Sequence, residues 1–506
     1  MKPRIYFIGI GGIGTSALAR WFLSKGYKVF GSDTSPSETT QELKKQGINV
    51  FLGQKASNLD KSINLVVHTA AVKAGNPEFD RAKELKIPIM SYAQALGSLT
   101  RQYKTIAIAG AHGKSTTTAL MSLVSIKAKL DPTVIVGTKL KEFGGSNFRP
   151  ARRSFNEGGN GKGEYLIIEA DEYANAFSNY YPWAAVVLNI DREHLDYYKN
   201  LSEIKNAFLG FIGNVKPGGI LILNKDDINL LSLKNKIEKI AKAEKIKIHW
   251  FGISGNRHIY QRLSASLKII GKHNVSNSLA VYELARLMNI KEKDIFGALN
   301  SFHGAWRRME YRGEFRTKNL EYRSKKIKKS SLILNPKSSI LVYDDYAHHP
   351  TEIKATLSGI AQKWPKRPLI CVFQPHQTKR LTSLFKEFSG AFGDANCLIL
   401  LDVFKVTGRE NPSEVTQNIS EKLAKVIKKR ISGKKFSAKG GSREAGQASS
   451  SKLQDVIYLP HSKQKNLKKV LENIILNSKF SILNSSAIII MMGAGDIYKM
   501  TDKLVK

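Results

Sequence analysis

Residues 110–115, Gly-Ala-His-Gly-Lys-Ser, combine a glycine turn with a lysine and a hydroxyl, which is chemistry suited to binding phosphate. The apolar residues 106–109 before them predict a buried strand, and the Ala-, Leu- and Met-rich residues after them predict a helix. Backbone N–H groups at a helix start attract an anion, and the Lys114 ammonium can reach terminal phosphates. The Ser115 hydroxyl can serve as a ligand of Mg²⁺.

The spacing of this segment departs from the general phosphate-loop pattern G-x-x-x-x-G-K-[ST], because that pattern would place a glycine where this chain has Ile108. A shorter form, G-x-x-G-K-S-T-T-T, remains. An ordinary glycine turn with a chance lysine is the alternative interpretation. The order of strand, turn, Lys-Ser pair and helix favours the phosphate site.

A second glycine turn follows a predicted strand at residues 5–8. Its glycines include the spacing G-x-G-x-x-G and stand at Gly9, Gly11, Gly12 and Gly14. Residues 29–33 predict a second strand that ends in Asp33, about twenty residues on, where an acid holds a ribose hydroxyl in dinucleotide sites. These features predict a site for a nucleotide or its diphosphate. His68, on a third predicted strand, is either a site residue or a satisfied polar residue at a strand end.

Polar residues also follow the later predicted strands. Glu169 ends a strand and is placed to supply a Mg²⁺ ligand beside the phosphate loop, with an exposed acidic turn as the alternative. His194 lies just beyond another strand, where a metal or phosphate role and a surface position both remain open. Asn274 and Asn277 open a helix where a base could be read, and simple N-capping by Asn274 is the alternative.

The last third of the chain holds two more polar loops after predicted strands. One contains two aspartates and two histidines within residues 344–349, and the other contains His376 and Arg380. Aspartate and histidine together raise the question of zinc, but their spacing suits no tetrahedral structural site. The two cysteines, Cys371 and Cys397, provide neither a disulfide framework nor a metal cluster.

The length of 506 residues suggests about three domains at roughly 150 residues each. No apolar run approaches the ~20 residues that span a bilayer, so we expect no membrane association and a cytoplasmic protein. The basic and apolar start of the chain is also compatible with a signal peptide, but glycines interrupt it from Gly9 onward.

The formal net charge of +38 is unusually high. Much of it lies in basic inserts near residues 312–338 and 428–452, and the Gly, Ser and Lys content of the second predicts a disordered loop. In this interpretation the excess positive charge lies on segments that are exposed to solvent. A polyanionic partner is the alternative, which would make the chain a basic nucleic-acid-binding ATPase.

Taken in order, these motifs resemble those of the Mur ligases, the ATP-dependent amide-forming enzymes of bacterial cell-wall synthesis. The matching segments span the chain and are residues 9–14, 110–115, 169–172, Asn189 with His194, His273 and Asn274 with Asn277, 307–310, 344–352, 373–376 and 493–496.

The resemblance implies a three-domain α/β fold. A Rossmann-like domain at 1–103 would bind the UDP-sugar, and a central P-loop ATPase-like domain with a parallel sheet, at 104–311, would bind ATP. A Rossmann-like C-terminal domain at 312–506 would close over the site and bind the amino acid. The implied reaction uses ATP and Mg²⁺ to activate the lactyl carboxylate of UDP-N-acetylmuramate as an acyl phosphate, which the amine of L-alanine then attacks. A monomer or homodimer is expected.

The resemblance also implies individual roles. Lys114 would hold the β- and γ-phosphates, and the predicted metal ligands are Ser115, Glu169 and, for a second Mg²⁺, His194. The predicted catalytic residues are Lys114, His194, Arg308, His348 and Arg380. The predicted ATP-binding residues are Gly110, Ala111, His112, Gly113, Lys114, Ser115, Thr116, Asn274, Asn277, Asp344 and Asp345. The predicted UDP-sugar-binding residues are Gly9, Gly11, Gly12, Gly14, Asp33 and His68. The predicted amino-acid-binding residues are Tyr346, His348, His376 and Arg380.

Two features bear on which member of the family this chain resembles. The family often has arginine after Phe-Gln-Pro-His, and this chain has Gln377 there. Residues 169–173 with Phe177 also resemble the recycling member, which joins a ready-made murein peptide to UDP-N-acetylmuramate. The glycine turn at 9–14 and the motifs at 373–376 and 493–496 favour the member that adds L-alanine.

Overall fold

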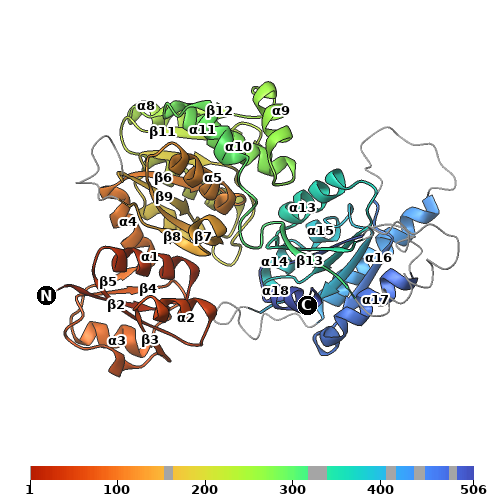
Figure 1. The fold of residues 1–506 in the computed structure, drawn as a ribbon, viewed down its shortest axis with the longest axis horizontal. Coiled ribbons are helices and arrows are strands. Elements are labelled where there is room, and N and C mark those ends of the chain that lie inside the picture. Colours follow the sequence, from red (N-terminus) through yellow and green to blue (C-terminus); the bar gives the residue numbers. More distant parts are fainter. Residues whose placement is uncertain are drawn as a thin grey trace. The chain divides into compact units, whose positions relative to one another are not determined.

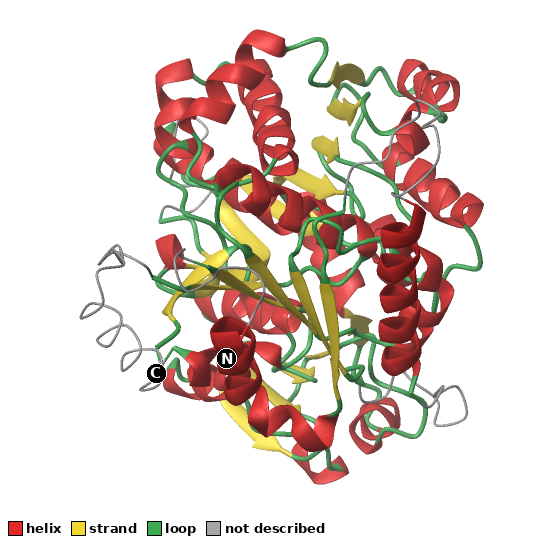
Figure 2. Ribbon diagram, turned by 90° about the vertical axis from the view of Figure 1, so that its right-hand side faces the viewer, coloured by secondary structure: helices red, strands yellow, loops and turns green. Residues whose placement is uncertain are grey.

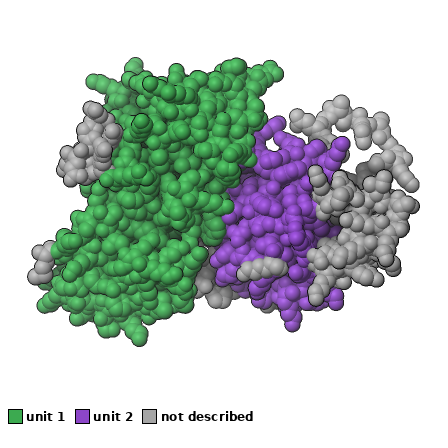
Figure 3. All heavy atoms as spheres, in the orientation of Figure 1, with its two compact units in different colours: residues 1–268, 274–306 green, residues 269–273, 307–506 purple. Residues whose placement is uncertain are grey.

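The computed structural model describes residues 2–152, 163–316, 339–405, 418–437, 451–477 and 487–505. The chain divides into two compact units (Figure 1; green and purple in Figure 3). The first unit comprises Met1–Lys268 and Asn274–Trp306, and the second comprises Ile269–His273 and Arg307–Lys506. In both units helices lie against the strands of mainly parallel sheets (Figure 2).

The N-terminal sheet of the first unit has the strand order β3-β2-β1-β4-β5, and its neighbouring strands are parallel. The order reverses beside β1, and open α/β sheets bind ligands at the carboxyl ends of strands at such a point. The elements are β1 (Arg4–Ile8), α1 (Ile13–Ser24), β2 (Lys28–Asp33), α2 (Glu38–Lys45), β3 (Asn49–Leu52), η1 (Ala56–Asn58), β4 (Leu65–His68), α3 (Pro77–Glu84), β5 (Ile89–Ser91) and α4 (Tyr92–Gln102).

The second sheet of this unit has the order β12-β11-β10-β6-β9-β7-β8. Its pairs are parallel except that β8 runs antiparallel to β7, so the predicted parallel sheet ends in a hairpin. The elements are β6 (Lys104–Ala109), α5 (Lys114–Lys127), β7 (Thr133–Leu140), η2 (Lys141–Phe143), β8 (Ser146–Arg149), β9 (Tyr165–Ala170), η3 (Tyr173–Asn179), β10 (Ala184–Val187), α6 (Leu201–Gly213), β11 (Ile220–Asn224), α7 (Ile228–Leu231), α8 (Lys234–Ala243), β12 (Lys247–Phe251), α9 (Arg257–Ser266), α10 (Lys272–Leu287) and α11 (Glu292–Leu299).

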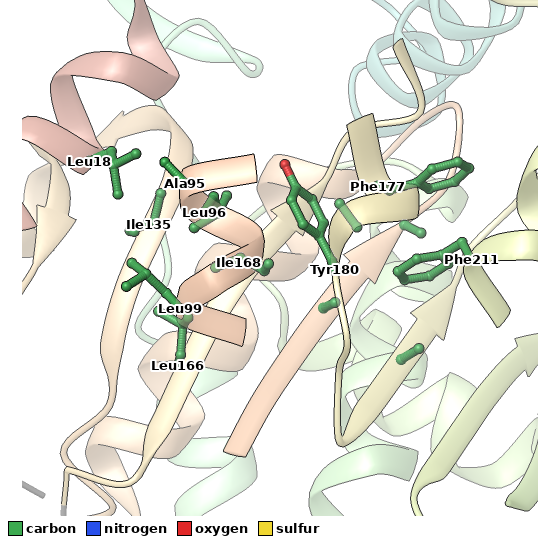
Figure 4. Packing of buried hydrophobic residues seen from close by; sticks show 14 of the residues in the cluster. Leu18, Ala95, Leu96, Leu99, Ile135, Leu166, Ile168, Phe177, Tyr180 and Phe211 are labelled. Carbon is green, nitrogen blue, oxygen red and sulfur yellow. The ribbon is translucent and has the colours of Figure 1, made fainter. Parts of the chain in front are cut away.

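A continuous apolar core joins these two sheets within the first unit. In Figure 4, Leu18 of α1 and Leu96 and Leu99 of α4 lie close to Ile135 of β7 and Leu166 of β9. Burial of such side chains stabilises the folded state by roughly 1.5–3 kcal/mol each. The two sheets are therefore held together by packing as well as by the connecting chain.

The sheet of the second unit has the order β13-β14-β18-β15-β16-β17, with β13 antiparallel to β14 and the other pairs parallel. Its central strands Leu369–Phe373, Cys397–Leu401 and Ile488–Met492 are apolar throughout, because both of their faces are buried. The elements are β13 (Glu310–Glu314), β14 (Leu341–Asp345), α13 (Pro350–Lys363), β15 (Leu369–Phe373), α14 (Thr378–Ser383), α15 (Phe385–Ser389), β16 (Cys397–Leu401), α16 (Ile419–Ser437), β17 (Asp455–Leu459), η5 (His461–Asn466), α17 (Leu467–Asn477), β18 (Ile488–Met492) and α18 (Ile497–Leu504).

Local sequence signals set several of the helix starts. Ser37 and Ser91 form capping boxes with the residues three positions later, at the starts of α2 and α4. Asn76 caps α3 directly before Pro77, whose fixed φ suits the first helical position. These signals place α4 immediately after β5, and α4 carries the residues that pack on the second sheet.

The predicted α/β class with three domains built on separate sheets is confirmed. The boundaries predicted at 103/104 and 311/312 stay predictions. Residues 317–338 of the first predicted insert lie outside the described residues. The prediction of a loop at 428–452 is wrong at its start, because α16 continues to Ser437, and residues 438–450 lie outside the described residues. Within the described ranges, none of the helices has the length and apolar character needed to cross a bilayer.

We predict that Leu99→Ala lowers the free energy of unfolding by about 2–5 kcal/mol, because Leu99 is only 2% exposed and packs between the two sheets of the first unit. Leu52→Ala is the matched control, because Leu52 is 49% exposed, and it should change stability by less than about 0.5 kcal/mol. Urea denaturation followed by circular dichroism measures both. Equal effects of the two substitutions would contradict the packing described.

Candidate active site

The phosphate loop joins β6 to α5 at the carboxyl edge of the second sheet. Gly113 precedes the helix with φ of 86°, a left-handed conformation that favours glycine. A Cβ at Gly113 would lie 2.7 Å from the Asn277 side-chain oxygen, and one at Gly110 would lie 3.0 Å from the Leu188 Cβ. Both glycines are therefore required by space as well as by conformation, and the sequence prediction of a strand, glycine turn and helix is confirmed.

Asn189, two residues beyond β10, fixes the shape of this loop. Its side chain accepts a hydrogen bond from the His112 N–H at 2.8 Å and donates one to the His112 carbonyl at 3.0 Å. Its own carbonyl accepts from the Ala111 N–H at 3.2 Å. The His112 ring lies 2.9 Å from the Asp191 carboxylate. The segment that follows the neighbouring strand β10 therefore holds the loop, through the side chain and the carbonyl of Asn189.

The Lys114 ammonium is buried at the start of α5. It donates to the carbonyl of Gly110 at 2.7 Å and forms an ion pair with the Glu172 carboxylate at 2.8 Å. Burial alone would lower the pKa of Lys114, but the carboxylates of Glu172 and Asp171 outweigh it and raise the pKa. Lys114 therefore keeps its positive charge in a site shielded from water.

Glu172 links Lys114 to His194. Its second carboxylate oxygen lies 3.5 Å from the His194 ring nitrogen. Burial would raise the pKa of Glu172, but Lys114 and His194 outweigh it and lower the pKa to about 2. The pKa of His194 is raised by Glu172 against the opposing effect of burial. His194 has a left-handed backbone with φ of 55°, a conformation that is uncommon for residues other than glycine.

Ser115 and Glu169 are brought together as predicted from their places in the sequence. The Ser115 hydroxyl lies 3.1 Å from one Glu169 oxygen, and the Gly137 N–H donates to the other at 2.6 Å. Hydroxyl and carboxylate oxygens are the ligands that Mg²⁺ prefers, so this pair fits a Mg²⁺ beside the phosphate loop. Asp171, Glu172 and His194 place further ligand atoms within 4.8 Å of one another.

Asn274 and Asn277 lie on one side of α10, and both are buried. Asn277 packs against Gly113 of the phosphate loop. The interpretation of Asn274 as a simple N-cap is wrong, because α10 begins at Lys272 and Asn274 is already inside its first turn. The structure thus brings this helix beside the phosphate loop, and its contact with adenosine stays a prediction.

The glycine turn after β1 is held by Asp33 at the end of β2. One Asp33 oxygen accepts from the Gly11 N–H at 2.8 Å. Gly9 has φ of 79°, and a Cβ there would lie 2.5 Å from a Thr69 methyl group. His68 lies at the end of β4 with its ring 5.2 Å from that of Phe79. These residues gather at the carboxyl ends of the strands, and their contact with a UDP-sugar stays a prediction.

The second unit gathers the other predicted cluster at the ends of β14 and β15. The Tyr346 and His348 rings lie 5.3 Å apart, and the His348 and His376 rings lie 5.8 Å apart. The Arg308 guanidinium lies 4.8 Å above the Tyr346 ring. Arg380, 8% exposed, donates to the His376 carbonyl at 3.2 Å. Five residues from three segments of the sequence thus lie close together, and Glu352 lies 3.8 Å from Arg308 and 3.3 Å from His348.

The aspartate pair at the end of β14 is buried. Asp344 accepts from Arg307 at 3.2 Å, and Arg307 also donates to the carbonyls of Gly493 and Gly495. Asp345 accepts from two backbone N–H groups, and burial raises its pKa to about 6 against the opposing effect of Arg308. Both carboxylates therefore organise the strand-end loops. Their predicted contact with adenosine stays a prediction.

Gln377, which stands where the family often has arginine, is buried and has φ of 68°. Its N–H donates to the Phe404 carbonyl at 3.1 Å, and the Phe404 ring stacks on that of His376. The loop that carries His376 and Arg380 is therefore fixed through its backbone.

The residues that support this site lie in the matching segments of the sequence analysis but were assigned no individual role there, although some carried a signal. Glu172 and Asn189 both follow a buried strand, where ligand-binding residues of parallel sheets gather. Glu352, which accepts from the His348 N–H at 3.0 Å, stands at the capping-box position of α13. The role of Arg307 could not be predicted, because its partners Gly493 and Gly495 are far away in the sequence.

The fold and the site define a nucleotide-binding α/β protein with a phosphate loop. The family model described as "Mur ligase family, catalytic domain" matches residues 4–104, "Mur ligase middle domain" matches 108–285, and "Mur ligase, glutamate ligase domain" matches 332–455. The chain belongs to the Mur ligase family.

Curated relatives cover nearly the whole chain. A UDP-N-acetylmuramate–L-alanine ligase of Clostridium kluyveri is 34% identical over 520 residues, covering 99% of this chain and 97% of the relative. One from Clostridium perfringens is 38% identical and covers 80% and 84%. The fold is similar to a solved UDP-N-acetylmuramate–alanine ligase from Thermotoga maritima (TM-score 0.69, 24% identity, 99% and 98% covered). It is also similar to a murein peptide ligase from Psychrobacter arcticus (TM-score 0.62, 20% identity, 99% and 98% covered).

We predict that Glu172→Gln destabilises the protein at pH 7 by about 3 kcal/mol, because the Lys114 ammonium stays buried without its counter-charge. The pKa of Glu172 is lowered from 4.5 to about 2 in the folded state, so its stabilising effect is complete above its ordinary pKa. That effect is lost as the pH falls from about 4.5 towards 2. Urea denaturation at pH 7, 4 and 3 should show the difference between the two proteins shrinking.

Glu84→Gln is the control, because the Glu84 side chain is 65% exposed and pairs with Arg81 on the surface. It should leave stability unchanged within about 0.5 kcal/mol. A Glu172→Gln protein as stable as the wild type at pH 7 would refute the assignment of a charged buried pair.

Proposed function

We propose that this protein is an ATP-dependent ligase that forms an amide between the lactyl carboxylate of UDP-N-acetylmuramate and L-alanine. The observation that carries the proposal is the phosphate loop, with Lys114 held by Glu172 and with Ser115 beside Glu169 at the same strand ends. The family membership and the names of relatives at 34–38% identity support the choice of substrates.

The proposed reaction has two steps. An oxygen of the lactyl carboxylate attacks the γ-phosphorus of ATP, ADP leaves, and an acyl phosphate forms. The amine nitrogen of the amino acid then attacks the acyl carbon, inorganic phosphate leaves with the bridging oxygen, and a proton is lost from the nitrogen. No covalent bond to the protein is required, so the protein contributes positions and charges.

The phosphate loop contributes N–H groups at the start of α5 and the Lys114 ammonium, which neutralises charge on the transferring phosphoryl group. Ser115 and Glu169 would hold Mg²⁺, and His194 would serve a second ion. Bound Mg²⁺ would supply positive charge that neutralises the phosphate groups. Asn277 packs against Gly113, and together with Asn274 it is proposed to contact the adenosine of ATP.

The glycine turn and Asp33 are proposed to bind the UDP of the sugar nucleotide, since a diphosphate suits N–H groups at the start of α1. In the second unit, Arg380 is proposed to bind the carboxylate of the amino acid, because a planar guanidinium matches a carboxylate in two parallel hydrogen bonds. His376 contacts Arg380, and the rings of His348 and Tyr346 continue from His376; we propose that these three rings limit the side chain that fits.

Two alternatives are less favoured. The recycling reaction would use a ready-made murein peptide as the amine, and the likeness to the Psychrobacter arcticus protein concerns the fold alone. A nucleic-acid-binding ATPase rests only on the basic charge. A cytoplasmic location and a monomeric or dimeric state stay predictions.

The test of the proposal is product analysis by mass spectrometry after incubation with ATP, Mg²⁺ and UDP-N-acetylmuramate. One reaction receives mixed amino acids, and another receives L-Ala-γ-D-Glu-meso-diaminopimelate. We expect the L-alanine product. The kcat/KM values for glycine and L-serine should be lower, by a factor that corresponds to about 1–3 kcal/mol of activation free energy. Joining of the tripeptide without use of free alanine would establish the recycling reaction instead.

We predict that Lys114→Ala folds but loses at least about 100-fold in kcat, or on the order of 3 kcal/mol, because it removes a charge aimed at the transferring phosphoryl group. Lys234→Ala is the control, because the Lys234 side chain is 51% exposed and distant in sequence from the loop. Steady-state phosphate release measures both. An intact circular dichroism spectrum with more than half of the wild-type rate would refute the role.

We predict that Arg380→Lys raises the KM for L-alanine by about tenfold or more while the KM for ATP changes little, because lysine cannot form the paired hydrogen bonds. Arg262→Lys, on a side chain that is 42% exposed, is the matched control. The two KM values are measured by varying one substrate at a time. A larger change in the KM for ATP would place Arg380 at the nucleotide instead.

A further inference from the structure

The hairpin of β7 and β8 lies between the two loops of the first unit that are proposed to bind nucleotides. Its turn contains Gly144 and Gly145, and Ser146 and Asn147 begin β8; the motif that these four residues form has no role in the binding sites described. The reaction requires the lactyl carboxylate to lie about 3–3.5 Å from the γ-phosphorus, and a misplacement of about 1 Å can cost 100-fold in rate. Whatever sets the distance between the glycine turn and the phosphate loop therefore limits the rate.

One end of the hairpin holds the helix that follows the glycine turn. Asn147, 2% exposed, donates to the Ile13 carbonyl at 2.5 Å and to the Ser16 hydroxyl at 3.1 Å, both in the first turn of α1. Its side-chain oxygen accepts from Arg20 at 2.7 Å. Arg20, 6% exposed, also forms an ion pair with Glu42 at 3.1 Å. The amide of Asn147 thus uses both its donor and its acceptor groups on α1.

The other strand of the hairpin reaches the phosphate site. Its Gly137 N–H donates to Glu169 at 2.6 Å, and Glu169 accepts from the Ser115 hydroxyl. Strand β7 also pairs with β9, which carries Glu169. Hydrogen bonds therefore link the first turn of α1 to Asn147 of β8, β8 to β7, and Gly137 of β7 to Glu169 beside the start of α5, although the pairing of β7 and β8 is interrupted between Ile135 and Leu140.

A second set of contacts supports the same connection. Lys139 at the end of β7 pairs with Glu42 at 2.8 Å and with Glu38 at 3.1 Å, both on α2. Beneath the polar contacts, Leu18 of α1 packs in the same core as Ile135 of β7 (Figure 4). Buried polar groups with all partners satisfied fix a unique arrangement, which apolar packing alone does less well.

We propose that Asn147 and Arg20 are positioning residues, which fix the glycine turn relative to the phosphate loop and so set the distance between the two reacting groups. The inference rests on the proposed function, because that function assigns one substrate to each loop. Neither residue touches a substrate; each acts through α1 and the hairpin. The motif at residues 144–147 then places the side-chain amide of Asn147 opposite the first turn of α1.

The kinetic test uses Asn147→Ala and Asn147→Asp in the full chain. Aspartate keeps the acceptor for Arg20 but places an oxygen opposite the Ile13 carbonyl, so both variants should lose on the order of 100-fold in kcat. The KM values for ATP and UDP-N-acetylmuramate should change by less than about threefold, because each loop keeps its own contacts. Asn214→Ala is the matched control, since it removes a side-chain hydrogen bond to the Ser178 carbonyl that involves neither α1 nor the hairpin.

A second measurement does not depend on the substrates. Spin labels on cysteines introduced at Lys25 and Lys127, both exposed near the ends of α1 and α5, report the separation of the two helices by pulsed EPR. The native cysteines are buried. The inference expects a narrow distance distribution that broadens or shifts with Asn147→Ala and not with Asn214→Ala.

These outcomes separate the two claims. If the wild type makes no amide product, the proposed function fails, while the EPR distances still test whether Asn147 fixes the two helices. The inference is overturned if kcat of the Asn147 variants stays within about threefold of the wild type, if their loss appears in KM instead, or if the distance distribution is unchanged.

Discussion

The ion pair between Lys114 and Glu172 is the constraint on which the phosphate site depends. A buried ammonium without a partner would lose its proton or turn towards water, and in either case it would no longer be available to a phosphate. Glu172 keeps Lys114 charged beside the Gly110 carbonyl, and it also raises the pKa of His194. A buried ion pair is a weak source of stability, so the value of this one lies in holding the Lys114 charge at a fixed place.

The hydrogen bonds around the site mainly fix the positions of loops. Asn189 holds the phosphate loop, Asp33 holds the glycine turn, and Arg307 joins the strand-end loops of the second unit. Catalysis of phosphoryl transfer consists mainly of positioning and charge stabilisation, and loops that are already fixed cost no reorganisation when the reaction occurs. The same principle extends to Asn147, which joins the two sheets of the first unit above their shared core.

The sequence predicted those features of the fold and site that are local. Strand, glycine turn and helix are consecutive, so the loops at Gly9 and Gly113 and the acids Asp33 and Glu169 were found from spacing. Whether Asp171 or Glu172 faces Lys114 could not be predicted, because it depends on the turn after β9, where Ala174 and Asn175 adopt left-handed φ values of 50° and 56°. The contact of Arg20 with Asn147 could not be predicted from the sequence either, because 127 positions separate the two residues.

Amino-acid composition led to a wrong prediction at one place in the chain. Lysine and glycine near residue 430 suggested a disordered loop, yet lysine is a good helix former, and Leu423 and Ile427 bury one side of α16. The antiparallel strand β8 was likewise not predicted, because a short hairpin at a sheet edge leaves no mark on the order of strand and helix patterns. In both cases tertiary packing determined the secondary structure, which amino-acid composition did not indicate.

The central claim is that the carboxylate is activated by direct phosphoryl transfer. It is tested by supplying UDP-N-acetylmuramate with ¹⁸O in the lactyl carboxylate, together with ATP, Mg²⁺ and L-alanine, and analysing the released phosphate by ³¹P NMR. Attack of a carboxylate oxygen on the γ-phosphorus, followed by loss of phosphate from the acyl carbon, predicts one ¹⁸O atom in each phosphate released during amide formation. Unlabelled phosphate, accompanied by normal amide product, would contradict the account.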